Sequence, residues 1–103
     1  MSKIRGIASY LPQSRLNNIF QAEKFGESAS FITDKIGAIR LPIMDSSQEA
    51  SDLAVSAIQR LCDEQGLSPD AVDALVVVTQ NGDGEGLPHT AAIVQAKLGL
   101  PST

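Results

Sequence analysis

The spacing of apolar residues specifies one helix more clearly than any other element of the chain. Its apolar positions are Ala50, Leu53, Ala54, Ala57, Ile58, Leu61 and Cys62. They recur at intervals of three and four residues and therefore form one continuous helical stripe. Ser46 and Glu49 have the spacing of a capping box, and Gly66 followed by Pro69 supplies a stop. We predict a helix between these signals, packed closely because half of its stripe is alanine.

Two segments have the pattern of strands. Residues 3–10 alternate loosely between apolar and other residues and end at Leu11-Pro12, where proline cannot donate to a ladder. Residues 74–79 read Ala-Leu-Val-Val-Val-Thr, a run without a polar face, which predicts a strand covered on both sides. Two strands cannot form such a covered sheet, and residues 100–103 look like a linker. We therefore expect the N-terminal portion of a larger α/β protein, or an obligate oligomer whose other copies supply the missing layers.

Short helices account for most of the remainder. Asn17 or Asn18 caps a helix that Gly26 stops, and Ser28 or Ser30 starts another that closes at Gly37. Ser68-Pro69-Asp70 begins a single helical turn. A last helix opens at Pro88 and ends at Gly99, and its nearly all-round apolar surface predicts burial.

Composition narrows the class of protein. The 103 residues are 43% hydrophobic and 19% charged, with a net charge of −4, which is typical of a soluble globular chain and unfavourable for binding nucleic acid. A single cysteine excludes an internal disulfide framework and fits a reducing compartment. No stretch approaches the ~18 apolar residues of a membrane span. We expect a cytoplasmic protein that contacts neither membrane nor nucleic acid.

The lone thiol and the lone imidazole are weak candidates for chemistry. Cys62 ends the apolar stripe in mid-helix beside Asp63 and Glu64, where the thiolate is disfavoured, so we interpret it as a packed structural residue. His89 lies in the first turn of the last helix. A metal site there would depend on Asp83 and Glu85, and a polar residue near a helix start is the simpler interpretation, so no metal is predicted.

Two further features resemble phosphate or nucleotide sites. Residues 82–86 read Gly-Asp-Gly-Glu-Gly between a strand and a helix, but the spacing is not Gly-x-Gly-x-x-Gly and the two carboxylates would repel pyrophosphate. A Rossmann-type nucleotide site is therefore disfavoured, and a mobile connecting loop is the default. Lys35 and Arg40 lie near Phe31 and could hold a phosphate or nucleotide by charge and stacking, but taken alone they favour a solvated face.

Taken in order, these elements resemble β-ketoacyl-acyl-carrier-protein synthase III. Residues 4–12 are similar to the family's opening strand with its Gly-x-x-Ser-Tyr-Leu-Pro pattern, and residues 30–37 to its Glu-Trp-Ile-x-x-Arg-Thr-Gly segment. Residues 51–54, 66–79 and 87–99 complete a match across essentially the whole chain. The resemblance implies an α/β chain that is part of the N-terminal half of a thiolase-like fold, layered α-β-α-β-α in the full protein and normally a homodimer. It also implies that residues 1–103 stop short of the catalytic Cys.

The resemblance carries a function and three site residues. The family condenses an acyl-coenzyme A with malonyl-acyl-carrier protein through an acyl-Cys intermediate, needs no cofactor besides its thioester substrate, and takes part in fatty acid biosynthesis. Phe31 stands where the family has a Trp that stacks on the adenine, and Lys35 where it has a phosphate-contacting Arg. Leu87 matches the residue that reaches across the dimer into the partner's acyl pocket. Phe is a smaller platform than Trp and Lys lacks the bidentate fork of Arg, which favours a divergent member with another acyl donor.

No catalytic residue of the family falls within the chain, and Cys62 does not match its nucleophile. The 103 residues alone are therefore expected to be inactive. The alternative hypothesis is a non-catalytic dimerisation or binding partner that retains part of the thiolase-like fold.

Overall fold

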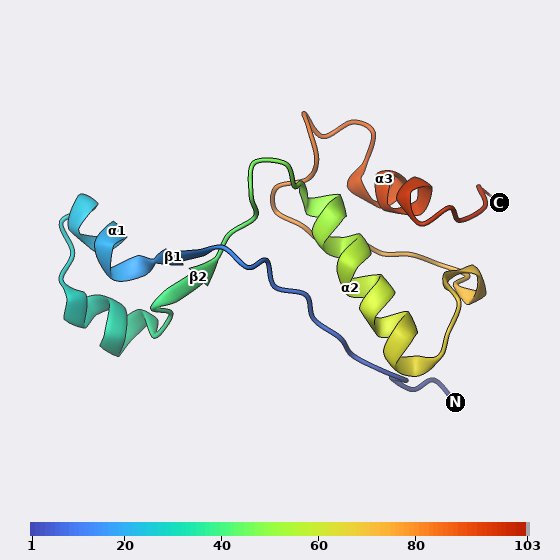
Figure 1. The fold of residues 1–103 in the computed structure, drawn as a ribbon, viewed down its shortest axis with the longest axis horizontal. Helices are drawn as coiled ribbons and strands as arrows, with labels where there is room; N and C mark the ends of the chain where they lie inside the picture. The colour runs from blue at the N-terminus through green and yellow to red at the C-terminus, as the bar shows by residue number, and fades with distance from the viewer. Residues whose placement is uncertain (103) are drawn as a thin grey trace. The chain divides into compact units, whose positions relative to one another are not determined.

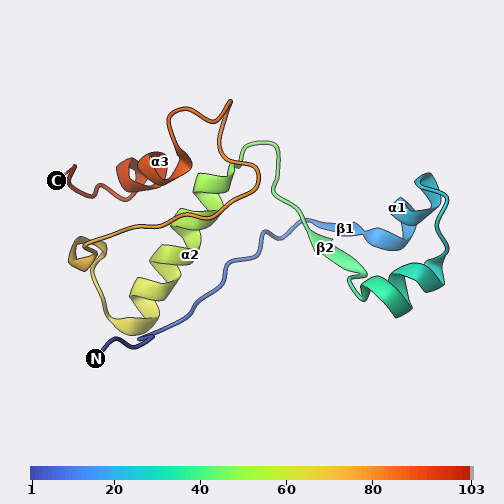
Figure 2. The same ribbon diagram turned by 180° about the vertical axis from the view of Figure 1, so that it is seen from behind.

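The structure is a computed structural model that describes residues 1–102, so Thr103, the last residue of the expected linker, lies outside it. Two compact units make up the chain: Pro12–Asp45 forms one, and Met1–Leu11 with Ser46–Thr103 forms the other. Figure 1 and Figure 2 show the elements of each unit from opposite sides.

The Pro12–Asp45 unit is a two-stranded ribbon with two short helices. Strand β1 (Arg15–Asn17) pairs antiparallel with β2 (Arg40–Pro42), with Leu16 opposite Leu41. Helix α1 (Asn18–Lys24) and the π-helix η1 (Phe31–Ile36) lie between the strands in sequence. The sequence analysis did not predict these strands, which are only three residues long.

Side-chain caps place both helices of this unit where the sequence predicted them. Asn17 Oδ1 accepts the Ile19 amide at 3.0 Å at the start of α1. Ser28 Oγ accepts the Phe31 amide at 3.2 Å at the start of η1, and Gly37 ends η1 with a left-handed φ of 76°. Ala22 and Ile32 are the buried apolar residues of the unit.

The second unit is built on α2 (Ala50–Gln65), the helix that the apolar stripe predicted. It ends at Gly66 in the left-handed conformation, and the short 3₁₀ helix η2 (Pro69–Ala71) follows with Ser68 as its cap. Helix α3 (Thr90–Lys97) packs against α2, with Val94 and Cys62 buried. The predicted packed role of Cys62 is thus confirmed, whereas the burial expected all round α3 is wrong, because Ala92 and Ala96 are exposed.

The capping box of α2 lies three residues later than predicted. Glu49, not Ser46, is the N-cap, and Asp52 takes the place that the sequence analysis gave to Glu49. Asp52 Oδ2 accepts the Glu49 amide at 2.9 Å. The predicted register, with Ser46 as the N-cap, is therefore wrong, and Glu49 is not among the residue types that usually cap a helix.

Neither predicted strand is present within residues 1–102. Residues 3–10 and 74–79 are extended but carry no ladder, and the second segment crosses α2 in both views (Figures 1 and 2). Val76 and Val78 are 82% and 92% exposed, while Leu75 and Val77 between them are half-buried. The prediction of a strand covered on both sides is therefore wrong for this structure, because the described chain supplies no neighbouring strand to accept and donate the ladder bonds.

Candidate functional site

Phe31 and Lys35 lie together on η1, as the resemblance implied for two neighbouring ligand contacts. Lys35 Nζ stands over the Phe31 ring, 5.8 Å from its centroid, which is within range of a cation–π interaction. Phe31 is half-buried and Lys35 is exposed. The π-helix therefore presents an aromatic face and a positive charge side by side.

A hollow of about 320 Å³ opens beside this pair. Its lining consists of Glu27, Ser28, Ser30, Phe31, Asp34 and Lys35. Asp34 accepts a hydrogen bond from Thr33 Oγ1 at 2.9 Å, and Ser28 and Ser30 bond to each other at 2.9 Å. Lys35 is thus the one cation in a lining that also holds the carboxylates of Glu27 and Asp34, and it stands beside the aromatic wall formed by Phe31.

Arg40 is not part of this group. It lies in β2 opposite Asn17, and it does not line the hollow beside Lys35. The structure brings together Phe31 and Lys35 from the candidate cluster and leaves Arg40 on the neighbouring ribbon.

Leu87 stands in the other unit and is 78% exposed. It lines a second hollow, of about 410 Å³, at the end of the loop formed by residues 80–87. Ser47, Glu49, Asp52, Asp83, Gly84, Pro88, Ile93 and Lys97 complete the lining. Leu87 is thus an exposed apolar side chain in a largely polar rim.

Asp83 links this loop to α2 by direct hydrogen bonds. Its Oδ1 accepts the Ser51 amide at 2.8 Å, and its Oδ2 accepts the Ser51 hydroxyl. Asp83 is 6% exposed and Ser51 is 0% exposed. The carboxylate therefore satisfies a free amide in the first turn of α2, where the helix dipole also favours negative charge.

Three more bonds connect the loop to its surroundings. The Asp83 amide donates to Thr90 Oγ1 at 3.0 Å, and the Gly84 amide donates to Glu49 Oε2 at 3.0 Å. Lys97 Nζ donates to Ser51 Oγ at 2.6 Å. The expectation of a mobile connecting loop is wrong at Asp83, because a buried carboxylate must keep its donors to remain buried.

The Lys97 ammonium also pairs with Asp52 Oδ1 at 2.8 Å, with both side chains about one-third exposed. This hydrogen bond holds the pKa of Asp52 below its ordinary value. The same bond raises the pKa of Lys97. The pair is therefore ionised around neutral pH, and Lys97 is a poor base toward the Ser51 hydroxyl.

The network around Asp83 was not found from the sequence. Its only signal there is Ser51, a polar residue beside the apolar stripe, and that signal does not name a partner 32 residues away. The glycine-rich loop was considered for phosphate and set aside. The structure agrees, since Asp83 and Gly84 already donate their amides to protein oxygens.

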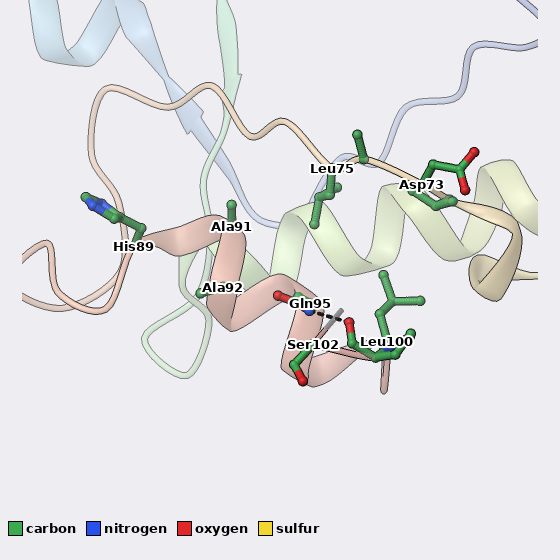
Figure 3. Close-up of a pocket in the computed structure, with 11 residues that line it drawn as sticks. Asp73, Leu75, His89, Ala91, Ala92, Gln95, Leu100 and Ser102 are labelled. Atoms are coloured by element: carbon green, nitrogen blue, oxygen red, sulfur yellow. Dashed lines mark hydrogen bonds between the residues drawn. The ribbon is translucent and has the colours of Figure 1, made fainter.

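His89 is the N-cap of α3 and is exposed. Figure 3 shows it at one end of a hollow of about 400 Å³, while Asp73 stands on the far side, so the two do not form an acid–base pair. Gln95 Nε2 donates to the Pro101 carbonyl at 2.5 Å along the same hollow. Among residues 1–102, His, Cys, Asp and Glu side chains form no group of three that could hold a metal ion.

A membrane-crossing helix is likewise absent from residues 1–102, where no helix combines the necessary length with the necessary apolar character.

Comparisons with known proteins identify relatives across nearly the whole chain. The beta-ketoacyl-[acyl-carrier-protein] synthase III of Neisseria meningitidis serogroup A is 38% identical over 99 residues, which cover 96% of this chain and 31% of that protein. The protein of the same name from Caldanaerobacter subterraneus subsp. tengcongensis is 38% identical over 96 residues, 93% of this chain and 29% of that protein. No family model matches the chain.

The fold matches a solved structure of the same kind. The crystal structure of 3-oxoacyl-(acyl carrier protein) synthase III, FabH, from Pseudomonas aeruginosa PAO1 has a TM-score of 0.74 and 34% sequence identity, covering 93% of this chain and 29% of that one. The predicted family resemblance and the predicted fold class, α/β and part of a thiolase-like fold, are thereby confirmed. The chain spans about a third of the length of the curated relatives it matches.

Proposed function

Because the chain is related to the β-ketoacyl-acyl-carrier-protein synthases III, we propose that it forms the acyl-donor entrance of a 3-oxoacyl-acyl-carrier-protein synthase III-like acyltransferase. The whole enzyme condenses an acyl-coenzyme A with malonyl-acyl-carrier protein. A cysteine thiolate first attacks the acyl thioester and releases coenzyme A. The carbanion formed by loss of CO₂ from the malonyl group then attacks the acyl-cysteine and releases the cysteine thiolate. The coenzyme A thioester is a substrate, and no further cofactor takes part.

The observation that carries this proposal is the pairing of Phe31 with Lys35 beside one hollow. A purine ring stacks on the face of Phe31, and the Lys35 ammonium, now above that face, moves to a phosphate oxygen of the same ligand. These two contacts replace the cation–π contact that Lys35 and Phe31 make with each other in the free protein.

The acyl-carrying cysteine of this mechanism lies outside residues 1–103. Cys62 is buried on the packed face of α2, where a substrate does not reach its thiol. The 103-residue chain by itself therefore binds the donor without transferring the acyl group. We place the reaction in the cytoplasm and in a homodimer, in which Leu87 contributes to the acyl pocket of the partner subunit.

Coenzyme A binding to the full-length natural protein tests the entrance. We expect Phe31→Ala to weaken binding by about 5- to 100-fold, the range that corresponds to loss of one base–aromatic stack. Phe31→Trp should tighten binding, because it enlarges the platform. Lys35→Ala should weaken it and reduce its salt dependence. Isothermal titration calorimetry with coenzyme A and with its pantetheine half separates nucleotide contacts from the rest.

Two nearby residues provide matched controls. Phe25 and Lys24 are the same residue types, are exposed, and lie outside the hollow, so Phe25→Ala and Lys24→Ala should leave the affinity unchanged. Equal losses in both sets of variants would refute the assigned entrance. Binding without release of coenzyme A, when acyl-coenzyme A and malonyl-acyl-carrier protein are supplied together, would favour the non-catalytic binding or dimerisation partner instead.

A further inference from the structure

Asp83 is the most constrained residue of the loop formed by residues 80–87. It is 6% exposed, and its carboxylate holds the amide and the hydroxyl of Ser51 at the start of α2. Its own amide is bound by Thr90 at the start of α3. One residue thus fixes the loop against both helices of this unit.

The loop fixed in this way presents Leu87 to solvent. Leu87 follows Asp83 by four residues, is 78% exposed, and lines the same hollow as the Asp83 side chain. Between them, the Gly84 amide is held by Glu49 and the Gly86 amide donates to the Asp83 carbonyl at 3.2 Å. These backbone bonds hold the segment between Asp83 and Leu87, and the Asp83 carboxylate anchors the start of that segment to Ser51 in α2.

The same cluster resembles an activated serine nucleophile, because Lys97 Nζ donates to Ser51 Oγ at 2.6 Å. That reading fails on two grounds. Ser51 is fully buried, so no substrate carbonyl reaches its hydroxyl. The Ser51 hydroxyl already donates its hydrogen bond to the Asp83 carboxylate, and the Lys97 ammonium is paired with Asp52. The cluster supports a structural element and performs no covalent chemistry.

We propose that Asp83 is a positioning residue that sets the place of Leu87 and thereby the acyl-chain length that the acyltransferase accepts. The inference rests on the proposed function, since it assigns Leu87 to the wall of an acyl pocket. Pocket walls discriminate chain length because one methylene in an apolar pocket is worth about 10- to 200-fold in kcat/KM. If Asp83 no longer holds the loop, Leu87 no longer has a fixed position, and the enzyme discriminates less between acyl chains of different length.

The test measures kcat/KM of the full-length protein for a series of acyl-coenzyme A donors of increasing chain length. We expect Asp83→Ala to reduce the preference between neighbouring chain lengths by about tenfold, within the range of one methylene. Asp83→Asn keeps the shape and one acceptor oxygen, so it should have a smaller effect and serves if Asp83→Ala does not fold. Glu85→Gln removes a charge from the same loop at an exposed position, and the preference should not change.

A double variant distinguishes positioning from general stability. If Asp83 acts through Leu87, Asp83→Ala should not change the preference any further in a Leu87→Ala background. A uniform fall in kcat/KM for every donor, with the preference intact, would overturn the inference and leave Asp83 with a purely stabilising role.

Hydrogen exchange separates failure of this inference from failure of the proposed function. Asp83→Ala should accelerate exchange of the Gly84 and Gly86 amides, whether or not the protein transfers an acyl group. If the wild-type protein condenses no donor, the proposed function fails and the specificity role of Asp83 falls with it. If the amides exchange at the wild-type rate in Asp83→Ala, the positioning step itself is wrong.

Discussion

Replacing Ser51 by alanine tests the energetic role of the buried network around Asp83. The Ser51 hydroxyl is fully buried, donates to the Asp83 carboxylate and accepts from Lys97 Nζ at 2.6 Å. A hydrogen bond to a charged group contributes about 1.5–3 kcal/mol. Alanine returns about 0.5 kcal/mol through its higher helix propensity. We therefore expect Ser51→Ala to lower the free energy of unfolding by about 1–2.5 kcal/mol.

The same substitution elsewhere in α2 provides the control. Ser56 is half-buried in the middle of the helix, and Ser56→Ala should be neutral or stabilise by up to about 0.5 kcal/mol. Urea denaturation followed by far-ultraviolet circular dichroism compares the two variants with the wild type. Equal stability of Ser51→Ala and Ser56→Ala would refute the argument that the network stabilises α2.

Two further predictions concern the packing of the same unit. The Asp52–Lys97 hydrogen bond lowers the pKa of Asp52, so its stabilisation is present above the unfolded-state pKa of Asp52 and is lost as pH falls through the folded-state value. The same bond raises the pKa of Lys97, so that contribution is present below its unfolded-state pKa and is lost as pH rises through the folded-state value. Asp52→Asn should therefore destabilise the protein at neutral pH, but not in acid below the folded-state and unfolded-state pKa values of Asp52. Urea denaturation at several pH values tests this. A stability difference between variant and wild type that persisted in acid would contradict it. Val94→Ala should lower the free energy of unfolding by about 2 kcal/mol, because Val94 is fully buried. Val78→Ala, at a 92% exposed position, should change it by less than about 0.5 kcal/mol. Equal losses of stability in thermal or urea unfolding would contradict the assigned core.

The helices could be predicted because their signals are local. Asn17, Ser28 and Ser68 each bond to an amide two or three residues ahead, so the cap and the amide that it satisfies occur in one short stretch of sequence. Gly37 and Gly66 mark ends for the same reason. The register of α2 was the exception, because its N-cap is Glu49, which is not one of the usual capping residues, and the Ser46 pattern three residues earlier is not used.

Strands could not be predicted in this way, because a strand exists only with a partner. Residues 74–79 have the composition of a buried strand, but Val76 and Val78 are exposed in the described chain. The three-residue strands β1 and β2 are too short for a pattern to indicate, and their pairing joins Leu16 to Leu41 across 25 residues of sequence. Local composition thus indicated where extended backbone occurs, but not which segments pair.

The candidate site likewise contains contacts that are local in sequence, which could be predicted, and contacts between distant residues, which could not. Phe31 and Lys35 are four residues apart on one helix, so their proximity follows from the sequence once a helix is assigned. Asp83 and Ser51 are 32 residues apart, and nothing in a glycine-rich loop indicates that one of its two carboxylates turns inward while Glu85 stays exposed. Only the fold distinguishes them.

In the larger unit a polar network is buried and hydrogen-bonded, whereas some apolar side chains are exposed. The polar side is closed: Ser51, Asp83 and Thr90 are buried and bonded to one another. The apolar side chains of Val76 and Val78 are by contrast 82% and 92% exposed. A buried polar network beside exposed valines is what a segment would show if its sequence were selected for packing within a larger assembly. On this view Asp83 acts inside the chain, whereas Val76 and Val78 act only when another surface covers them.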